Sequence, residues 1–216
     1  MPRKIIIWDW NGTLLNDVEI CVNCINQLLE NRGLPLLNLQ KYREVFTFPV
    51  KDYYEKLGFD FQTESFEYVA NEFIDEYTKR MENAGLYHNT DEILRYFKKS
   101  GYDQFIVSAM EHKMLTMLVK EKGISFYFND IIGIKDIYAK SKLNIADDLI
   151  KKLNTSFENI VFIGDTLHDH EIAMHFGFRS ILMTHGHQSE KRLNQAGVLT
   201  QDNFLQLMPV VEKALN

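Results

Sequence analysis

The feature that most constrains the fold is a short apolar run near the start of the chain that ends in a carboxylate. Residues 5–8 read Ile-Ile-Ile-Trp, and Asp9 follows, ahead of an Asn11-Gly12 turn. A near-continuous apolar run is typical of a buried strand in a parallel sheet. Ligands of such sheets bind beyond the carboxyl ends of the strands. Asp9 is therefore expected at this edge, where a buried charge needs a cation or hydrogen bonds, although a carboxylate in this pattern can also simply cap a turn.

The rest of the chain divides into a helical segment and an alternating one. Residues 14–86 read almost entirely as amphipathic helix, whereas helices of about ten residues alternate with apolar strands from Thr90 onward. Alternation of this kind predicts an α/β fold with a doubly wound parallel sheet. We expect residues 1–14 and 87–216 to form this core and residues 15–86 to form a helical unit, with hinges near residues 14–17 and 85–88. The further strands are expected at 103–108, 130–134, 159–164 and 179–183.

Polar residues follow the other expected strands at the same edge. Ser108 ends the strand 103–108, and Asp165 follows the strand 159–164, with Asp169 four residues later. Two lysines, Lys140 and Lys142, precede the helical stretch 143–153. A carboxylate, a hydroxyl, a lysine and two further carboxylates thus occur in that order, most of them at strand ends.

This order resembles the four motifs of the haloacid dehalogenase superfamily, and in particular its phosphoglycolate-phosphatase-like branch. The family's motifs are Asp-x-Asp-Gly-Thr, a Ser or Thr after a strand, a Lys, and Gly-Asp-x-x-x-Asp. Residues 9–13 and 164–169 carry the first and fourth, and the likeness extends over essentially the whole chain. It implies a Rossmann-like core, with a helical cap inserted after the first strand that closes over the active site and helps select the substrate.

The resemblance also implies a reaction, namely Mg²⁺-dependent hydrolysis of a small phosphorylated metabolite through an aspartyl-phosphate. Asp9 would be the nucleophile, and Asp9, the Asn11 carbonyl and Asp165 would hold the metal, which suits a hard cation. Asp169 would orient a metal-bound water or the lysine. The phosphoryl group would be held by Gly12, Thr13, Ser108, Ala109 and Lys142. Family spacing favours Lys140 as the motif lysine, but the Ser141-Lys142 context favours Lys142, which we choose.

Asn11 departs from the family pattern, because phosphatases of this superfamily usually carry a second Asp there as general acid and base. An amide can perform neither task, and such help is typically worth about 10²–10⁴-fold in rate. The NH₂ group of Asn11 could still donate a hydrogen bond to the leaving group. Four histidines are candidate substitutes: His168, His170, His185 and His187.

Composition excludes several other functions. The net charge of −6 argues against binding to a nucleic-acid backbone, and the longest apolar runs are too short for a membrane span. We therefore expect a cytoplasmic enzyme, monomeric or homodimeric, that binds neither nucleic acid nor membrane. The Cys21-x-x-Cys24 pair falls in an expected helix, so we expect packed thiols and no redox or zinc site. Lys51 could meet an anionic substrate group or be an ordinary surface lysine.

Two other functions remain open on the same fold. A catalytically weak regulatory protein that binds phosphate ligands is favoured by Asn11 alone. A phosphomutase would need acid–base help from this same position. A dehalogenase would not need Asp165 and Asp169, and a dinucleotide-binding dehydrogenase would carry Gly-x-Gly-x-x-Gly after the first strand, which this chain lacks.

Overall fold

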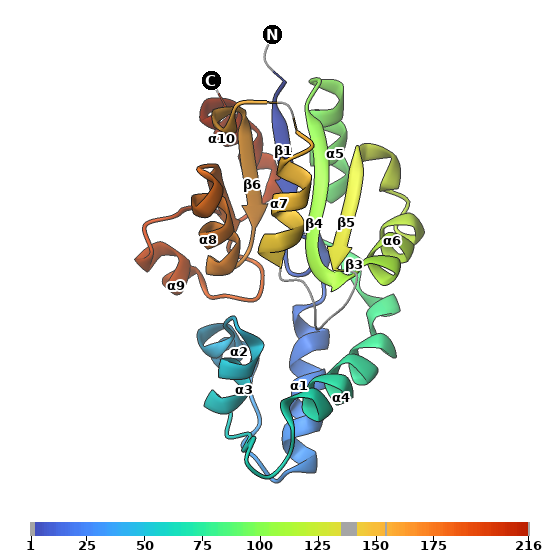
Figure 1. Ribbon diagram of the computed structural model, residues 1–216, viewed down its shortest axis with the longest axis vertical. Coiled ribbons are helices and arrows are strands. Elements are labelled where there is room, and N and C mark those ends of the chain that lie inside the picture. The colour runs from blue at the N-terminus through green and yellow to red at the C-terminus, as the bar shows by residue number, and fades with distance from the viewer. Residues whose placement is uncertain (1–2, 135–141, 154, 216) are drawn as a thin grey trace.

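The computed structural model describes residues 3–134, 142–153 and 155–215. A parallel sheet has helices on both faces, and the helices α1 to α4 lie beyond one end of its strands (Figure 1). The strands are β1 (Ile5–Trp8), β2 (Leu15–Asn16), β3 (Gly85–Leu86), β4 (Asp103–Glu111), β5 (Asp130–Ile134), β6 (Ile160–Gly164), β7 (Arg179–Met183) and β8 (Leu199–Gln201). The helices are α1 (Val18–Asn31), α2 (Leu39–Val45), α3 (Val50–Lys56), α4 (Phe66–Thr78), α5 (Thr90–Lys99), α6 (His112–Glu121), α7 (Lys142–Ile150), α8 (Leu167–Phe176), α9 (Glu190–Gln195) and α10 (Phe204–Ala214). Short 3₁₀ turns span Met81–Asn83, Ser125–Tyr127 and Phe157–Asn159.

The main sheet has the strand order β5-β4-β1-β6-β7-β8, and every neighbouring pair in it is parallel. β1 lies inside the sheet, and its four residues are fully buried. Because side chains alternate along a strand, Ile6 and Trp8 pack on one face, and Ile5 and Ile7 pack on the other. This arrangement confirms the predicted α/β fold with a doubly wound parallel sheet.

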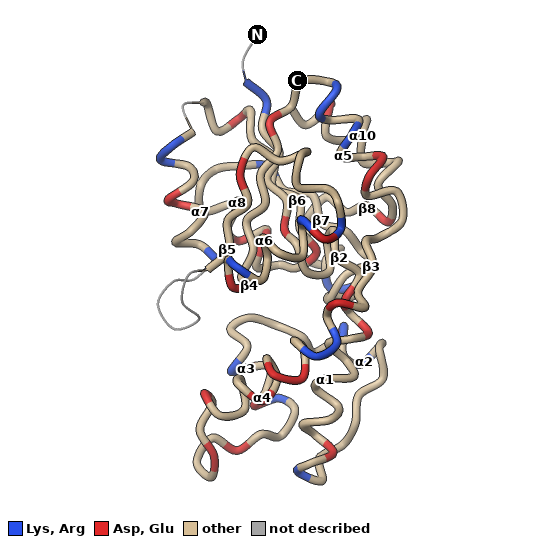
Figure 2. The backbone as a smooth tube through the Cα atoms, turned by 90° about the vertical axis from the view of Figure 1, so that its right-hand side faces the viewer, with Lys and Arg blue, Asp and Glu red and all other residues tan. Residues whose placement is uncertain are grey.

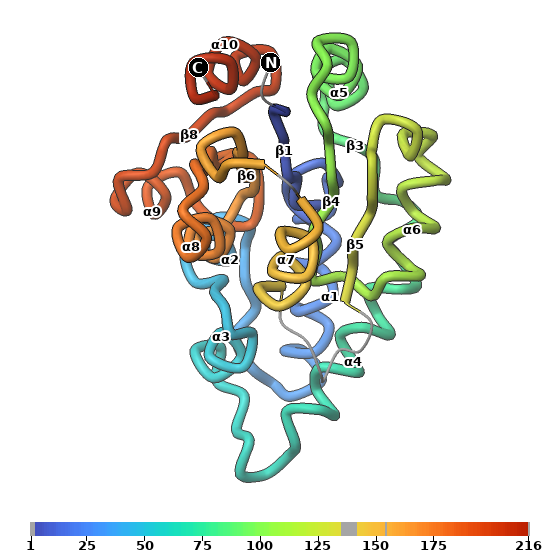
Figure 3. Tube along the Cα trace, turned by 45° about the horizontal axis from the view of Figure 1, so that its top comes forward, coloured from blue at the N-terminus to red at the C-terminus, as the bar shows by residue number. Residues whose placement is uncertain are grey.

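Helices fill both of these faces (Figure 3). Phe97 of α5, Leu118 of α6 and Leu207 of α10 belong to the apolar cluster of Ile6 and Trp8. α7 and α8 cover the opposite face, where they bury apolar side chains against Ile5 and Ile7. Burial on both faces explains why the strands read as continuous apolar runs.

The carboxyl ends of the strands point toward α1 to α4, as the arrowheads of β4, β5 and β6 show (Figure 1). Asp9 follows β1 at this edge, and Asp165 follows β6. The prediction that Ser108 ends its strand was wrong, because β4 continues to Glu111. Its pairing with β5 becomes irregular between Ser108 and Glu111, so Ser108 is the last residue in regular register before a bulge.

Four elements were missed by the sequence patterns, each for a physical reason. β2 and β3 pair antiparallel through only two residues each, which is too short to show a period. β8 is a three-residue edge strand with no fully buried side chain. α10 contains Pro209, a residue that ordinarily marks a break in a helical pattern. The β2–β3 pair joins the two chain crossings that we expected to act as hinges.

The inserted helices pack around a cluster of aromatic rings. Tyr54 contacts Phe59, Phe66 and Phe73 with ring centroids 5.2, 6.0 and 6.5 Å apart. Arg32, at the end of α1, links this helix to α4 and to the segment before it. It donates hydrogen bonds to Glu64 at 2.6 and 2.8 Å and to Glu72 of α4 at 2.6 Å. These aromatic side chains therefore form a core for the inserted helices.

In the part of the chain that the structure describes, charged residues of both signs are interspersed, without a long basic stripe (Figure 2). Among the described residues, no helix is both long and apolar enough to cross a bilayer.

Candidate active site

Lys142 lies between two carboxylates at the carboxyl edge of the sheet. Its Nζ is 2.6 Å from Oδ1 of Asp9 and 2.5 Å from Oδ1 of Asp169, and all three side chains are almost fully buried. Burial lowers the pKa of Lys142, but the two facing carboxylates outweigh it and raise this pKa above its ordinary value. Lys142 is thus a fixed positive charge held against Asp9. Lys140, the alternative lysine, lies outside the described residues.

Asp169 also shapes the turn after β6. Its Oδ2 accepts hydrogen bonds from the Thr166 hydroxyl at 2.8 Å and from the backbone N–H groups of Thr166 and Asp165 at 3.0 and 3.2 Å. One carboxylate therefore orients the lysine with one oxygen and fixes the turn that presents Asp165 with the other. Both contacts explain the four-residue spacing between Asp165 and Asp169.

Asp165 is fully buried and is held from two sides. The Thr13 hydroxyl donates to its Oδ1 at 3.0 Å, and the His187 backbone N–H donates to its Oδ2 at 2.6 Å. Gly12 adopts a left-handed φ of 70°, and a Cβ on it would overlap the Asp165 carboxylate and the His187 ring. Only glycine permits this close approach of the first loop to Asp165.

The carboxylates outnumber the positive charges near them. Ligand oxygens of Asp9, Asp165 and Asp169 all lie within 4.8 Å of one another. Burial, followed by repulsion from Asp169 and Asp165, raises the pKa of Asp9 above its ordinary value, and the facing Lys142 opposes this rise. Burial also raises the pKa of Asp165 to about 6. A compact set of hard oxygen donors with excess negative charge fits a divalent cation such as Mg²⁺.

The predicted phosphate-side residues lie near the end of β4 and in the segment that follows Asp9. Ser108 is buried, and its hydroxyl accepts a hydrogen bond from the Met110 N–H at 3.1 Å and lies 3.5 Å from Oδ1 of Asn11. Ala109 is exposed beside it, and Gly12 and Thr13 belong to the loop that follows Asp9. The structure thus brings both groups of predicted phosphate-side residues to one edge of the sheet.

Comparison with known proteins decides the family. Residues 6–183 match the family model described as haloacid dehalogenase-like hydrolase, which is most of the chain. The chain belongs to the haloacid dehalogenase-like hydrolases. The predicted resemblance to this family is confirmed, and the protein is an enzyme of the hydrolase class.

Relatives and solved structures agree with this family. Phosphoglycolate phosphatase 1 of Pseudomonas aeruginosa is 23% identical over 99% of this chain and 81% of that protein. N-acetylmuramic acid 6-phosphate phosphatase of Pseudomonas putida is 22% identical over 100% of this chain and 99% of that protein. A predicted phosphatase from Clostridium acetobutylicum has a TM-score of 0.84 at 18% identity, covering 99% of this chain and 100% of that one. A hydrolase of the same family from Streptococcus pneumoniae has a TM-score of 0.83 at 18% identity, covering 96% and 98%.

Asn11, the departure of this hydrolase from its family's motif, is oriented differently from our expectation. Its Nδ2 donates to Oδ2 of Asp17 at 2.7 Å and to the Tyr77 hydroxyl at 2.9 Å, so both amide hydrogens are engaged. The idea that this NH₂ group donates to a leaving group is therefore wrong. The amide presents its oxygen, an acceptor, toward Ser108.

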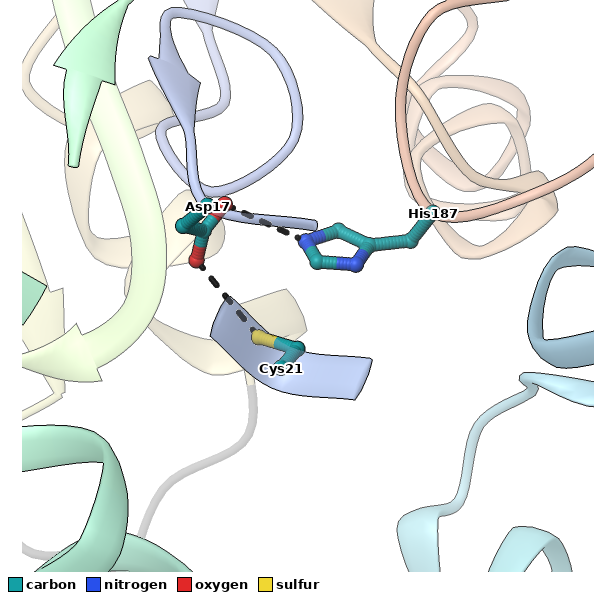
Figure 4. A group of neighbouring side chains, drawn as sticks. All are labelled: Asp17, Cys21 and His187. Atoms are coloured by element: carbon teal, nitrogen blue, oxygen red, sulfur yellow. Dashed lines mark hydrogen bonds and ion pairs between the residues drawn. The ribbon is translucent and has the colours of Figure 1, made fainter. Parts of the chain in front are cut away.

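A second buried cluster of this hydrolase lies directly beside Asn11, and sequence reasoning missed it. Asp17 and Cys21 lie four residues apart at the start of α1, His187 comes from the segment after β7, and the three side chains point toward one another (Figure 4). His187 Nε2 lies 3.4 Å from Oδ1 of Asp17, and the Cys21 thiol donates to Oδ2 at 3.7 Å. Burial raises the pKa of this thiol well above its ordinary value, so it stays protonated. The cluster is held by hydrogen bonds and an ion pair; a metal would need a thiolate here.

The other candidate side chains have contacts of their own. His185 Nε2 lies 3.2 Å from the Thr13 carbonyl, and the ring stacks on Tyr87. His170 Nδ1 contacts the Ser180 hydroxyl at 2.7 Å, and the His168 ring packs 4.9 Å from Phe48. Exposed Lys51 lies 5.7 Å over the Phe61 ring. Cys21 and Cys24 are free, buried thiols within α1.

Proposed function

We propose that this chain is a Mg²⁺-dependent phosphatase that hydrolyses a small phosphorylated metabolite through an aspartyl-phosphate on Asp9. The observation that carries the proposal is the buried ion pair of Asp9 with Lys142, at 2.6 Å, beside Asp165. It gives one carboxylate at the sheet edge a fixed cation on one side and a second carboxylate on the other. The names of the relatives support phosphoric monoester hydrolysis.

In the proposed reaction, an oxygen of Asp9 attacks phosphorus and the bond to the leaving oxygen breaks, with its electron pair on that oxygen. Phosphoryl transfer demands mainly positioning and charge neutralisation. Lys142 and the Ser108 hydroxyl would hold phosphoryl oxygens, joined by backbone N–H groups of the two loops. Water then attacks the same phosphorus, so that inorganic phosphate leaves, the water proton passes to solvent and Asp9 is released as a carboxylate.

The proposed metal site consists of Asp9, the Asn11 carbonyl and Asp165. When bound there, Mg²⁺ would reduce the electrostatic repulsion between these carboxylates and a dianionic phosphate. Thr13 and the His187 N–H fix the Asp165 carboxylate by the hydrogen bonds described above. Asp169 would position Lys142.

We further propose that residues 15–86 act as a cap over a core of residues 1–14 and 87–216. Several contacts seat α2 and its following segment on the loop after β7. The Tyr42 hydroxyl lies 2.8 Å from Nδ1 of His187, and Gln188 donates to the Phe46 carbonyl at 3.2 Å. These contacts place cap residues next to the residues that hold Asp165. The cap would thereby help select the substrate, which we infer to be phosphoglycolate-like from the names of the relatives.

Hydrolysis of p-nitrophenyl phosphate tests the proposal. Its leaving group needs little protonation, so the assay reports on the nucleophile and metal despite Asn11. We expect Mg²⁺-dependent activity that is lost in Asp9→Ala and kept in Asp52→Asn, a change of an exposed carboxylate on α3. Activity that persists in Asp9→Ala would overturn the mechanism.

A second candidate function is a phosphate-binding regulatory protein on the same fold. The orientation of Asn11, with no amide hydrogen left for a leaving group, favours it. Calorimetry with inorganic phosphate and Mg²⁺ separates the two. Binding without turnover of any phosphate ester would select the regulatory function.

A further inference from the structure

Asp17 makes unusual contacts for its position. It directly precedes α1, where an Asp side chain ordinarily accepts a hydrogen bond from the first turn of the helix. The Asp17 side chain makes no such bond. Its Oδ1 accepts from the Gly12 N–H at 2.9 Å, and its Oδ2 accepts from the Tyr77 hydroxyl at 2.7 Å and from Asn11 at 2.7 Å. A residue in a capping position thus accepts two hydrogen bonds from the segment that follows Asp9.

The charge of Asp17 is secured although its side chain is fully buried. Gly12, Asn11 and Tyr77 donate hydrogen bonds to its two carboxylate oxygens, and His187 Nε2 lies 3.4 Å from Oδ1. A carboxylate can only accept hydrogen bonds. The Asn11 amide must therefore turn its NH₂ group toward Asp17 and its oxygen toward Ser108.

This geometry makes position 11 incompatible with a carboxylate as long as Asp17 is present. Replacing the amide nitrogen by oxygen would put two carboxylate oxygens 2.7 Å apart where a hydrogen bond now lies. Like charges at that distance in a buried site strongly repel each other. Tyr77 could not relieve this repulsion by donating to a carboxylate at position 11, since its single hydroxyl hydrogen already goes to Asp17.

We infer that Asp17 is a positioning residue that selects the amide at position 11, so that Asn11 and Asp17 form a coupled pair controlling proton donation to the leaving group. Its catalytic consequence rests on the proposed phosphatase function. In the present pair, the leaving oxygen receives no proton from position 11, and esters with good leaving groups are the preferred substrate class. Exchanging the two side chains would reverse the pair without changing its net charge. The amide at position 17 and the Tyr77 hydroxyl would then both donate to a carboxylate at position 11.

The test compares the full-length wild type with Asn11→Asp, Asp17→Asn and the double exchange. Asn16→Asp is the matched control, because it makes the same chemical change on the exposed residue that precedes Asp17. Thermal unfolding reports the pairing without requiring activity. Values of kcat/KM for p-nitrophenyl phosphate and phenyl phosphate report the dependence on the leaving group, which a purely structural role would not change.

We expect Asn11→Asp alone to lower Tm by roughly 4 °C or more, with no gain in kcat/KM. The double exchange should recover this Tm and raise kcat/KM for phenyl phosphate about tenfold or more over wild type. The gain for p-nitrophenyl phosphate should be smaller, which flattens the dependence on the leaving group. Asn16→Asp should leave both readouts unchanged.

Contrary results are equally clear. An Asn11→Asp protein as stable and as active as the double exchange would overturn the coupling. So would a double exchange that recovers neither readout, or that fails to fold. If Asn11→Asp alone fails to fold and the double exchange folds, the coupling is supported. If the wild type hydrolyses neither ester, the proposed function fails. The Tm values alone then decide the pairing: it is supported if the Tm change of the double exchange differs from the sum of the two single changes, and overturned if the changes are additive.

Discussion

At the scale of single residues, the site depends on one lysine between two buried carboxylates. We predict that Lys142→Met lowers kcat/KM for p-nitrophenyl phosphate by about 10²–10³-fold, the usual range for losing one group that stabilises transition-state charge. Asp9 would also lose Lys142, its one ion-pair partner among the residues that the structure describes.

Lys151→Met is the matched control for this prediction. Lys151 directly follows α7, at whose start Lys142 lies, but its side chain is 69% exposed and pairs with Asp147. Exposed pairs contribute little, so activity should stay within a factor of two. An equal loss in both variants would mean that a general charge effect, and not the contact with Asp9, is responsible.

The residues of the site differ in how far sequence could predict them. Asp9, Asp165 and Asp169 were predictable because each follows a buried strand or a fixed spacing from one. The role of Asp17 was not, since it depends on Tyr77, which is 60 residues away in the chain. The orientation of Asn11 could not be predicted for the same reason, because an isolated amide can turn either way.

At the scale of secondary-structure elements, α4 reaches the catalytic loop through one hydroxyl. Tyr77 donates to the buried Asp17 carboxylate at 2.7 Å. We predict that Tyr77→Phe costs about 1–2 kcal/mol, the usual cost of unsatisfying a buried acceptor, and lowers Tm by roughly 3–6 °C. Tyr68→Phe on the same helix is the control, since its side chain is 63% exposed. Similar melting temperatures for the two variants would refute this role of α4.

The inserted helices also contain a pH-sensitive contact away from the site. Hydrogen bonds from Arg32 hold the pKa of Glu64 below its ordinary value. A carboxyl whose pKa is lowered by folding stabilises the protein above its unfolded pKa, and this contribution disappears as the pH falls through the folded pKa. We therefore expect Arg32→Gln to lower Tm at pH 7 and to lower it much less near pH 3.

Lys79→Gln serves as the control for this pH dependence, because Lys79 forms an exposed pair with Glu76 and its side chain is 66% exposed. It should change Tm little at either pH. A Tm difference for Arg32→Gln that stays constant across the pH range would assign the effect to packing of Arg32 on Phe59, which lies 5.2 Å away.

The elements themselves were predictable where the period was long enough to read. Apolar runs located β1 and β6, and helical spacing located α1 and α5. The pairing of Leu15 with Leu86 could not be predicted, because it depends on two short segments that are far apart in the chain and are separated by the inserted helices. α10 was missed because Pro209 interrupts its apolar pattern and ordinarily indicates a break in a helix. Packing of Phe204 and Leu207 in the core nevertheless stabilises this helix.

At the scale of the whole molecule, folding gathers negative charge at the edge where the sheet meets the inserted helices. Asp9, Asp165 and Asp169 come from two strand ends more than 150 residues apart and share one buried space with a single described lysine, Lys142. Folding thus works against this repulsion, and a cation that binds the folded state alone must stabilise the protein. The net charge of −6 for the whole chain adds to this attraction.

We predict that Mg²⁺ raises Tm. At ten times its dissociation constant, a ligand of the folded state contributes about 1.4 kcal/mol, which corresponds to roughly 3–6 °C for a protein of this size. Asp165→Asn should abolish most of the shift, because Asp165 is a proposed ligand, whereas Asp147→Asn, an exposed change on α7, should retain it. Differential scanning fluorimetry with MgCl₂ against KCl of equal ionic strength measures the effect. A shift that is equal in both salts, or that survives in Asp165→Asn, would place the stabilising cation elsewhere, because general screening and a specific site differ in this dependence.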